Sequence, residues 1–525
     1  MRFDTRILAI CCGILATVFL LTLLVYPLLV ILSRSFSDVA GVWQILSNPF
    51  YLSRLGFTVF QALISTALTL VLALPTALLF ARYDFAGKRV LKSVFTIPFV
   101  MPSVVAGIGF LSLFGSRGLT GLELRNTFAI ILLAHVFYNY AVVVRIVGSY
   151  LQNAGQRARE AAQMLGASST RILFRVTLPL ALPAIVAAGT LVFIFCFTSF
   201  GVILFLAPAP EFRTLEIEIY QLSTRLLDLQ GAGVLVLVQL GIISLFNLLY
   251  TRIQARLALG VTRSSAALPR PKGWARVLLN LNLVFAFLLV LSPLAALTLA
   301  AFWQDGFTLS NFVNLLDAPR TIGFAGALPA LMNSLRFALL STLLALLVGF
   351  AFAYAVVRAR LNWLDSASLL PLATSAVTLG FGYLLAFPQL RASPWGVMLA
   401  HTLIAFPFVT RALLPALRGL EPNLLAASAT LGAGVWRQLF RVELPLLKPS
   451  IITAASFAFA ISMGEFGATL TLQSARHATL PVAIFDRLGR PGATNYGSAL
   501  ALAFVLMLIT GLVMGVLERF GEGEF

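Results

Sequence analysis

Two stretches of this chain repeat one pattern. Residues 160–183 read EAAQMLGASSTRILFRVTLPLALP, and residues 426–449 read AASATLGAGVWRQLFRVELPLLKP. Leu-Gly-Ala, a single arginine, Phe-Arg-Val and Leu-Pro-Leu recur in the same order and at the same spacing in both copies. Each copy is a polar island in a very apolar chain. The duplication therefore indicates a surface that was kept twice because it meets something outside the membrane.

The composition excludes a soluble protein. Of the 525 residues, 60% are hydrophobic and 11% are charged, which is too few charges to solvate a surface of this size. Many apolar runs approach or exceed the roughly 20 residues needed to cross a bilayer. We predict an all-α polytopic membrane protein with about twelve spans. These lie near residues 7–32, 57–81, 94–114, 127–149, 182–206, 231–251, 277–302, 335–357, 366–387, 396–417, 449–472 and 497–517.

The basic residues indicate the topology. A net charge of +18 would suggest a nucleic-acid partner in a soluble protein, but in a membrane protein the Lys and Arg of short loops set the orientation. With the N-terminus inside, the inner segments carry about twice as many Lys and Arg residues as the outer loops. We therefore expect cytoplasmic N- and C-termini, cytoplasmic copies of the repeat and no nucleic-acid partner.

The N-terminal run and the cysteines have plain interpretations. The apolar run after Arg6 is too long for a cleaved signal peptide, so we expect a retained first span. Cys11, Cys12 and Cys196 form neither a disulfide framework nor a zinc spacing. We expect no metal or cofactor in this chain.

The repeat extends over the whole chain. Ser65-Thr66, Ala134-His135 and Thr214-Leu215 recur as Ser341-Thr342, Ala400-His401 and Thr479-Leu480. Six spans in each half is an even number, so the two halves point the same way across the membrane. We predict a first half over 1–251, a basic cytoplasmic linker over 252–276 and a second half over 277–525. The linker is rich in Arg and Pro without acidic residues, and we expect it to lie along anionic headgroups.

Each copy of the repeat predicts a helix–glycine–helix elbow. In the first, residues 157–165 form a short helix, Gly166 supplies the left-handed conformation that ends it, and Ser168 or Ser169 caps the next helix. We name residues 157–180 the first elbow and residues 423–446 the second elbow. A single loop of this kind would be read as an amphipathic linker at the membrane surface. Two matching copies favour a docking surface.

The elbow sequence resembles a known motif. EAAQMLGAS followed by Leu-Pro is similar to the cytoplasmic EAA loop of permease subunits of ATP-binding-cassette importers. The resemblance implies that the short helix docks in a groove of the nucleotide-binding subunit and couples its closure to the membrane helices. The matching residues are Glu160, Ala161, Ala162 and Gly166 in the first elbow, and Ala427 and Gly432 in the second. Ala426 replaces the glutamate, so we expect the second elbow to dock by shape more than by charge.

The same resemblance implies the partners. No Gly-x-x-x-x-Gly-Lys-Ser/Thr motif occurs, so ATP hydrolysis with magnesium belongs to a separate subunit and this chain is not itself an enzyme. The resemblance implies two copies of an ATPase subunit, an external solute-binding protein and a place in the bacterial inner membrane. The overall architecture is that of a type I importer permease.

Several stretches resemble the fused double permeases of thiamine and ferric-iron importers. They are FTSFG at 197–201, RTLEIEIY at 213–220 and SMGEFG at 462–467, and the thiamine type is favoured by GEFG and by LAHVFYN at 133–139. The resemblance implies import of a small solute, thiamine in the first place, with ferric iron or another small ligand as the alternative. A member of another class, an ion-coupled secondary transporter, would need more buried charges than the spans contain.

Candidate residues of the transport path lie in the fifth and eleventh spans. Glu465 falls inside the eleventh span, where an ionisable group faces a cavity or a partner, so it is either a contact for a cationic substrate or a hydrogen-bonded helix end. Ser199 and Phe200 occupy the matching place in the first half. Phe200 and Phe466 either form an apolar constriction or pack as core.

Two polar features outside those spans have alternative interpretations. His135 and His401 recur at matching positions, and because no carboxylate or cysteine stands at ligand spacing, interhelical hydrogen bonding is favoured over a metal site. The outer loop 207–230 carries several acidic residues. It is either a contact for the external binding protein or a solvated face.

Overall fold

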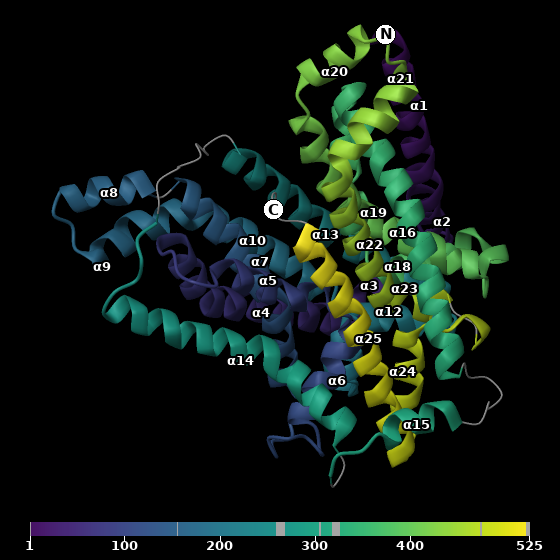
Figure 1. The fold of residues 1–525 in the computed structure, drawn as a ribbon. Helices are drawn as coiled ribbons and strands as arrows, with labels where there is room; N and C mark the ends of the chain where they lie inside the picture. Colours follow the sequence, from purple (N-terminus) through teal and green to yellow (C-terminus); the bar gives the residue numbers. More distant parts are fainter. Residues whose placement is uncertain are drawn as a thin grey trace.

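The computed structural model is all-helical, which confirms the predicted fold class (Figure 1). The structure describes residues 2–154, 156–258, 268–303, 306–317, 326–472 and 475–520. Within these residues, ten helical stretches are long and apolar enough to cross a membrane, and two bent helix pairs would bring the number to twelve. The count of about twelve spans is therefore met only if each bent pair crosses once.

The helices follow one order in each half. The first half contains α1 (Arg2–Leu20), η1 (Leu21–Val25), α2 (Tyr26–Ser35), α3 (Val39–Ser47), α4 (Pro49–Arg82), α5 (Lys88–Val100), α6 (Ser103–Phe114), α7 (Phe128–Ala154), α8 (Gln156–Met164), α9 (Ser169–Ile172), η2 (Leu173–Thr177), α10 (Leu178–Phe197), α11 (Gly201–Leu206), η3 (Pro210–Phe212), α12 (Leu215–Gln221), η4 (Leu222–Leu226) and α13 (Leu229–Ala258). The second half contains α14 (Trp274–Phe302), α15 (Ser310–Asp317), α16 (Ala327–Arg358), α17 (Asn362–Ala367), η5 (Leu370–Ala373), α18 (Ala376–Ala386), η6 (Pro388–Leu390), α19 (Pro394–Gly419), α20 (Pro422–Thr430), α21 (Val435–Gln438), η7 (Leu439–Glu443), α22 (Leu444–Gly464), α23 (Gly467–Leu472), η8 (Ala475–His477), α24 (Leu480–Leu488) and α25 (Ala493–Phe520).

Prolines account for a sharp bend in the third span. The chain turns by 100° between α5 and α6, where Met101 is extended because the residue before Pro102 is disfavoured in the helical region. The matching pair in the second half, 362–373 and 376–386, bends by 94°, and the Ser375 side chain caps the new helix at Thr378.

The predicted fifth and eleventh spans are wrong at both ends. Helix α10 ends at Phe197 instead of continuing to 206, and α22 ends at Gly464 instead of continuing to 472. Short helices α11 and α23 follow after a break in each case. At its other end each long helix reaches back to the elbow, giving continuous stretches over 169–197 and 435–464.

The two halves exchange their first helices. Helix α1 packs against α16, so that Ala9 and Ala16 share a core with Phe352 of the second half. Conversely, α14 packs against α6, α4 and α5, and Ala286 shares a core with Tyr140 of the first half. The division at 251 and 277 stays a prediction about the chain. In space each bundle is completed by a helix from the other half.

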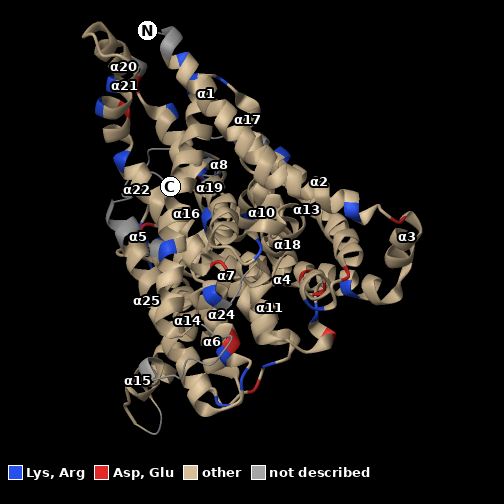
Figure 2. Ribbon diagram, turned by 90° about the vertical axis from the view of Figure 1, so that its right-hand side faces the viewer, with Lys and Arg blue, Asp and Glu red and all other residues tan. Residues whose placement is uncertain are grey.

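The predicted linker over 252–276 overlaps the ends of two helices, and the linker itself stays a prediction. Helix α13 continues to Ala258 and α14 begins at Trp274, while 259–267 lie outside the described residues. The surface of the long helices carries many exposed apolar side chains, as expected where lipid replaces water; examples are Ile14, Leu63, Val71, Leu281 and Leu343. Figure 2 shows that most of the ribbon bears neither acidic nor basic residues.

Candidate functional site

The two elbows have the same backbone structure. Gly166 has φ +75° and Gly432 has φ +78°, so each supplies the left-handed residue that the sequence predicts. The glycine N–H donates to Gln163 O (2.9 Å) or Ala429 O (3.0 Å). The next N–H reaches five residues back, to Ala162 O or Ser428 O, at 3.0 Å in both elbows. This pair of bonds is the Schellman ending of a helix, and it fixes the angle between the two short helices.

The elbow residues of the resemblance lie together at the surface. Glu160, Ala161, Ala426 and Ala427 are exposed and Ala162 is half-buried. The apolar tips are more exposed still, at 88% for Met164, 87% for Leu165 and 86% for Leu431. Figure 1 shows α8 and α9 at one extremity of the molecule and α20 and α21 at another. Exposed apolar tips on a polar helix suit a protein partner, and docking itself stays a prediction.

Both elbows lead into a π-turn, which the sequence did not predict. Helices η2 (LFRVT) and η7 (LFRVE) occupy matching places just before α10 and α22. A π-turn adds one residue to the helical turn and is frequent at functional sites. The equivalence of the two sequences in the repeat was the available signal, but nothing in their composition distinguishes a π-turn from an ordinary helix.

A central cavity of about 350 Å³ lies between the two halves. Its lining is rich in aromatic rings, with a few polar side chains on the first-half side; they include Phe99, Phe195, Phe200, Phe408, Phe457, Tyr138, His135, Asn139 and Ser199. Nδ1 of His135 is 2.8 Å from Ser65 Oγ, while Nε2 has no hydrogen-bond partner in the described part of the chain. The cavity therefore combines apolar walls with a small number of polar atoms, which is typical of a small-molecule site.

Phe200 and Phe466 meet at the interface between the halves. Their rings stack with centroids 5.8 Å apart and planes at 27°, and both side chains are buried. Phe205 and Phe485 extend the cluster. Phe200 lines the central cavity and also a second cavity of about 210 Å³. The pair is thus packed as core and also stands on the wall between two cavities, where a constriction would be placed.

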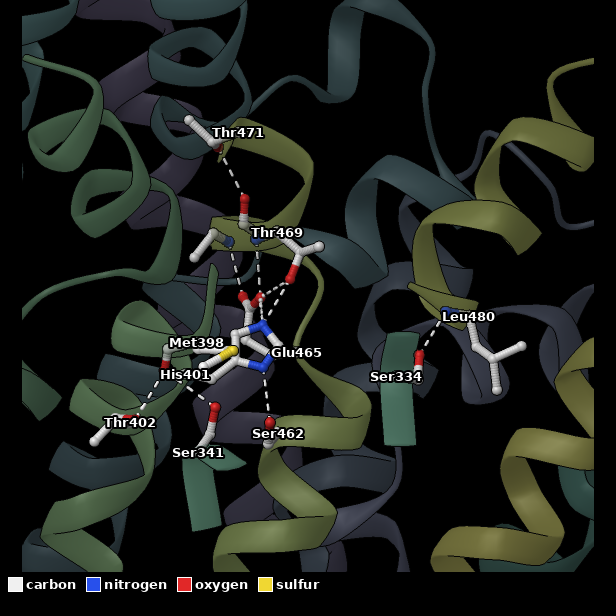
Figure 3. A network of polar contacts seen from close by, with 12 residues as sticks. Ser334, Ser341, Met398, His401, Thr402, Ser462, Glu465, Thr469, Thr471 and Leu480 are labelled. Atoms are coloured by element: carbon white, nitrogen blue, oxygen red, sulfur yellow. Dashed lines mark hydrogen bonds and ion pairs between the residues drawn. The ribbon is translucent and has the colours of Figure 1, made fainter. Parts of the chain in front are cut away.

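Glu465 lies in the break between α22 and α23 and not inside a continuous span. Its carboxylate accepts hydrogen bonds from Ala468 N (2.7 Å), Thr469 N (2.9 Å) and Thr469 Oγ1 (2.6 Å) (Figure 3). His401 Nε2 is 3.1 Å from the same carboxylate. The side chain therefore caps the start of α23, and both of its oxygens are hydrogen-bonded. A role on the transport path stays a prediction.

The histidines form interhelical hydrogen bonds, as predicted. His401 Nδ1 lies 2.7 Å from Ser462 Oγ, and Nε2 lies 2.7 Å from Thr469 Oγ1. The sequence shows no carboxylate at ligand spacing beside either histidine, but the fold brings Glu465 to His401 from another segment of the chain. In the described residues no group of three or more His, Cys, Asp and Glu side chains is placed to hold a metal ion.

The acidic segment before α13 is only partly a solvated loop, because Glu211 and Asp228 are exposed while Glu216 and Glu218 are buried. Residues 215–221 form helix α12, and Glu216 is fully buried. Gln239 Nε2 donates to Glu216 Oε1, and Oε2 has no partner among the described residues. Glu216 lines the smaller cavity together with Glu465. The acidic residues of this segment suggested a solvated face. The matching second-half segment, Leu-Pro-Val-Ala-Ile, is apolar and was the available signal for burial.

The sequence is similar to permease proteins of several known transport systems. The chain is 28% identical over 504 residues to the thiamine transport system permease protein ThiP of Escherichia coli (strain K12), covering 92% of this chain and 91% of that protein. It is 26% identical over 494 residues to ThiP of Salmonella typhimurium (strain LT2), covering 90% of each. A putative 2-aminoethylphosphonate transport system permease protein, PhnV of Salmonella paratyphi A, is 32% identical over 265 residues, which are 48% of this chain and 96% of that protein.

The family match falls once in each half. The family described as binding-protein-dependent transport system inner membrane component matches residues 73–263 and 345–522. Each matched region contains one elbow, and both ThiP alignments run through the two halves. The chain therefore belongs to the inner-membrane permease components of binding-protein-dependent ATP-binding-cassette importers.

Proposed function

We propose that this chain is the fused permease of a thiamine importer. Family membership makes it an inner-membrane subunit that works with an ATPase and a binding protein, and it excludes the ion-coupled secondary transporter. The choice of thiamine rests on one observation, the likeness to ThiP proteins over nine-tenths of both chains. PhnV matches only half of this chain, so it supports the family more than the solute.

The cavities suit an aromatic cation. Thiamine carries a positively charged thiazolium ring and an aminopyrimidine ring, and aromatic side chains attract cations over their faces. Of the described residues that line the two central cavities, none is Lys or Arg, while two are glutamates. A phosphonate anion would find no cationic partner there. We place the transport path along Ser199, Phe200, Phe466 and Glu465, with the aromatic pair as its constriction.

Ferric iron is the weaker alternative. Iron(III) needs several oxygen or nitrogen ligands, and the described residues offer no group of three such side chains. The three relatives compared above are named for thiamine and 2-aminoethylphosphonate.

The elbows are the proposed coupling points. Two ATPase subunits would each receive one elbow, and their closure on ATP would move α10 and α22 through the π-turns that join them to the elbows. This arrangement requires the elbows, and with them both chain termini, on the cytoplasmic side. The proposal includes neither a nucleic-acid partner nor a cofactor bound to this chain.

Transport in proteoliposomes tests the proposal. The permease is reconstituted with the ATPase and binding protein of the same organism, and uptake of labelled thiamine is measured with and without ATP. We expect ATP-dependent uptake that excess 2-aminoethylphosphonate and ferric citrate leave unchanged. Uptake of iron or of the phosphonate in place of thiamine would overturn the choice of solute, and labelling of 160–180 from the outside would overturn the orientation.

A further inference from the structure

The buried carboxyl group of Glu216 has an oxygen without a partner. Gln239 Nε2 donates to Oε1, but Oε2 receives no hydrogen bond from the described residues. The side chain of Ser375 is close enough to Glu216 for a hydrogen bond, although its hydroxyl is best placed to donate to Thr378 Oγ1 at 2.9 Å. A carboxylate oxygen without a hydrogen bond in a dry interior is costly, so it calls for an explanation such as a bound water, ion or ligand.

Glu465 supplies the other carboxyl group of the same cavity, and both of its oxygens have hydrogen-bond partners. Its oxygens take two backbone N–H groups, the Thr469 hydroxyl and the His401 ring. A new ligand would have to displace these bonds. The available acceptor of the cavity is therefore Glu216, which the sequence had placed in an outer loop.

The cavity is built by both halves but is not symmetric. Ser103, Phe200 and Gly201 come from the first half, and Ser375 and Phe466 from the second. The repeat aligns Glu216 with Pro481 and Glu465 with Ser199, so each half supplies one carboxylate at a position where the other half has none. The residues found lining the cavity in the described chain include no Lys or Arg to balance Glu216.

We propose that Glu216 is the specificity-determining residue that recognises the positive charge of the solute. Its Oε2 would receive the cationic ring of a small organic monocation when Phe200 and Phe466 separate, while the aromatic lining of the neighbouring 350 Å³ cavity holds the uncharged remainder. The inference rests on the proposed thiamine importer and deepens it, because it assigns the charge recognition to one side chain of one half.

The first test compares two solutes in two variants. Uptake of thiamine and of its neutral analogue, in which a thiophene ring replaces the thiazolium, is measured for wild type, Glu216→Gln and Glu218→Gln. Glu218 is a matched control, since it is a buried glutamate of the same helix that lines neither central cavity. We expect Glu216→Gln to raise KM for thiamine about tenfold or more and to leave the neutral analogue within about twofold. Glu218→Gln should change neither value.

A second measurement needs no variant. A hydrophobic carbodiimide modifies buried carboxyl groups, and mass spectrometry of the wild-type permease–ATPase complex reports each site. Millimolar thiamine should slow modification of Glu216 severalfold, and the neutral analogue should not.

Each result has one meaning. Equal loss of both solutes in Glu216→Gln, unchanged thiamine uptake in that variant, or modification of Glu216 that thiamine does not slow would overturn the inference. If wild type fails to transport thiamine at all, the proposed function itself has failed.

Discussion

The two elbows share one backbone and differ in their charges. Both end the first short helix with a left-handed glycine and the same pair of hydrogen bonds. In the second elbow the buried Glu443 forms a partly buried ion pair with Arg358 at the end of α16, at 2.8 Å. The first elbow has Thr177 in place of Glu443, and there Arg82 lines a cavity of about 610 Å³ with Glu160.

The comparison shows what duplication preserved. The glycine, the helix lengths and the π-turn define the shape that a partner would meet, and they are the same in both halves. At the end of the long helix, Arg358 pairs with Glu443 in the second half, whereas in the first half Arg82 and Glu160 line the same cavity. Shape is therefore the common requirement, and charge has been distributed differently, which fits the loss of glutamate at Ala426.

The largest effect is expected at the ion pair. Glu443→Leu leaves Arg358 without its partner in a nearly buried place, and removing one member of such a pair costs about 3 kcal/mol. Thermal unfolding of the detergent-purified protein measures it. Thr177→Val at the matching place should cost less than about 1 kcal/mol. The double variant Arg358→Leu/Glu443→Leu should recover most of the loss; no recovery would mean that Glu443 acts through other contacts.

A smaller effect is expected at the cap of α23. Glu465→Ala removes the acceptor for two backbone N–H groups and leaves Thr469 and His401 short of a partner, which costs about 2 kcal/mol. Unfolding midpoints measure the change, with Ser199→Ala at the matching position as the control. A loss of stability of the same size in both variants would show that the two breaks are equivalent, contrary to their contacts.

The glycines test whether shape is the shared property. Gly166→Val and Gly432→Val each place a β-branched residue in the left-handed region at a cost of about 1–2 kcal/mol. No atom lies within 4 Å of an added Cβ at either site, so the effect is conformational and not a clash. Both variants should lose copurification with the ATPase, while Gly166→Asn and Gly432→Asn should keep most of it. If only one of the two valine variants loses copurification, the ATPase depends little on the other elbow.

The sequence predicted the features that occur in both halves and those that follow from apolar runs of membrane-spanning length. The all-α class, the elbows and their glycines followed from apolar runs and from a motif present twice. The breaks at 198–200 and 465–466 did not, because Ser199 and Glu465 were interpreted as polar positions inside continuous spans with apolar residues on both sides. Close packing around the breaks explains these glycines. A Cβ at Gly201 would lie 2.3 Å from Ser103 Oγ of the same half, and a Cβ at Gly464 would lie 3.1 Å from Pro102 Cγ of the other half.

Contacts between distant segments could not be predicted from spacing. His401 meets Glu465 across 64 positions of chain, and the exchange of α1 and α14 between the halves leaves no local trace. Glu216 was assigned to the surface because charge usually lies there. At the matching position the other half has Pro481 in an apolar segment. That comparison would have indicated that Glu216 is a single carboxylate in a buried segment.

The smallest effect is expected for the charge of the elbow surface. If shape carries most of the docking, Glu160→Ala should weaken ATPase binding only about two- to fivefold, because an exposed ion pair contributes little. Ala426→Glu restores the glutamate in the second elbow, so it should strengthen binding by a similar small factor, and Ala426→Ser should change nothing.

Titration of labelled ATPase into nanodiscs at two salt concentrations measures the three variants. Both glutamate effects should shrink at high salt. If Glu160→Ala weakens ATPase binding about fiftyfold or more, charge contributes more to docking than shape does. The second elbow, which lacks the glutamate, would then bind the ATPase more weakly than the first.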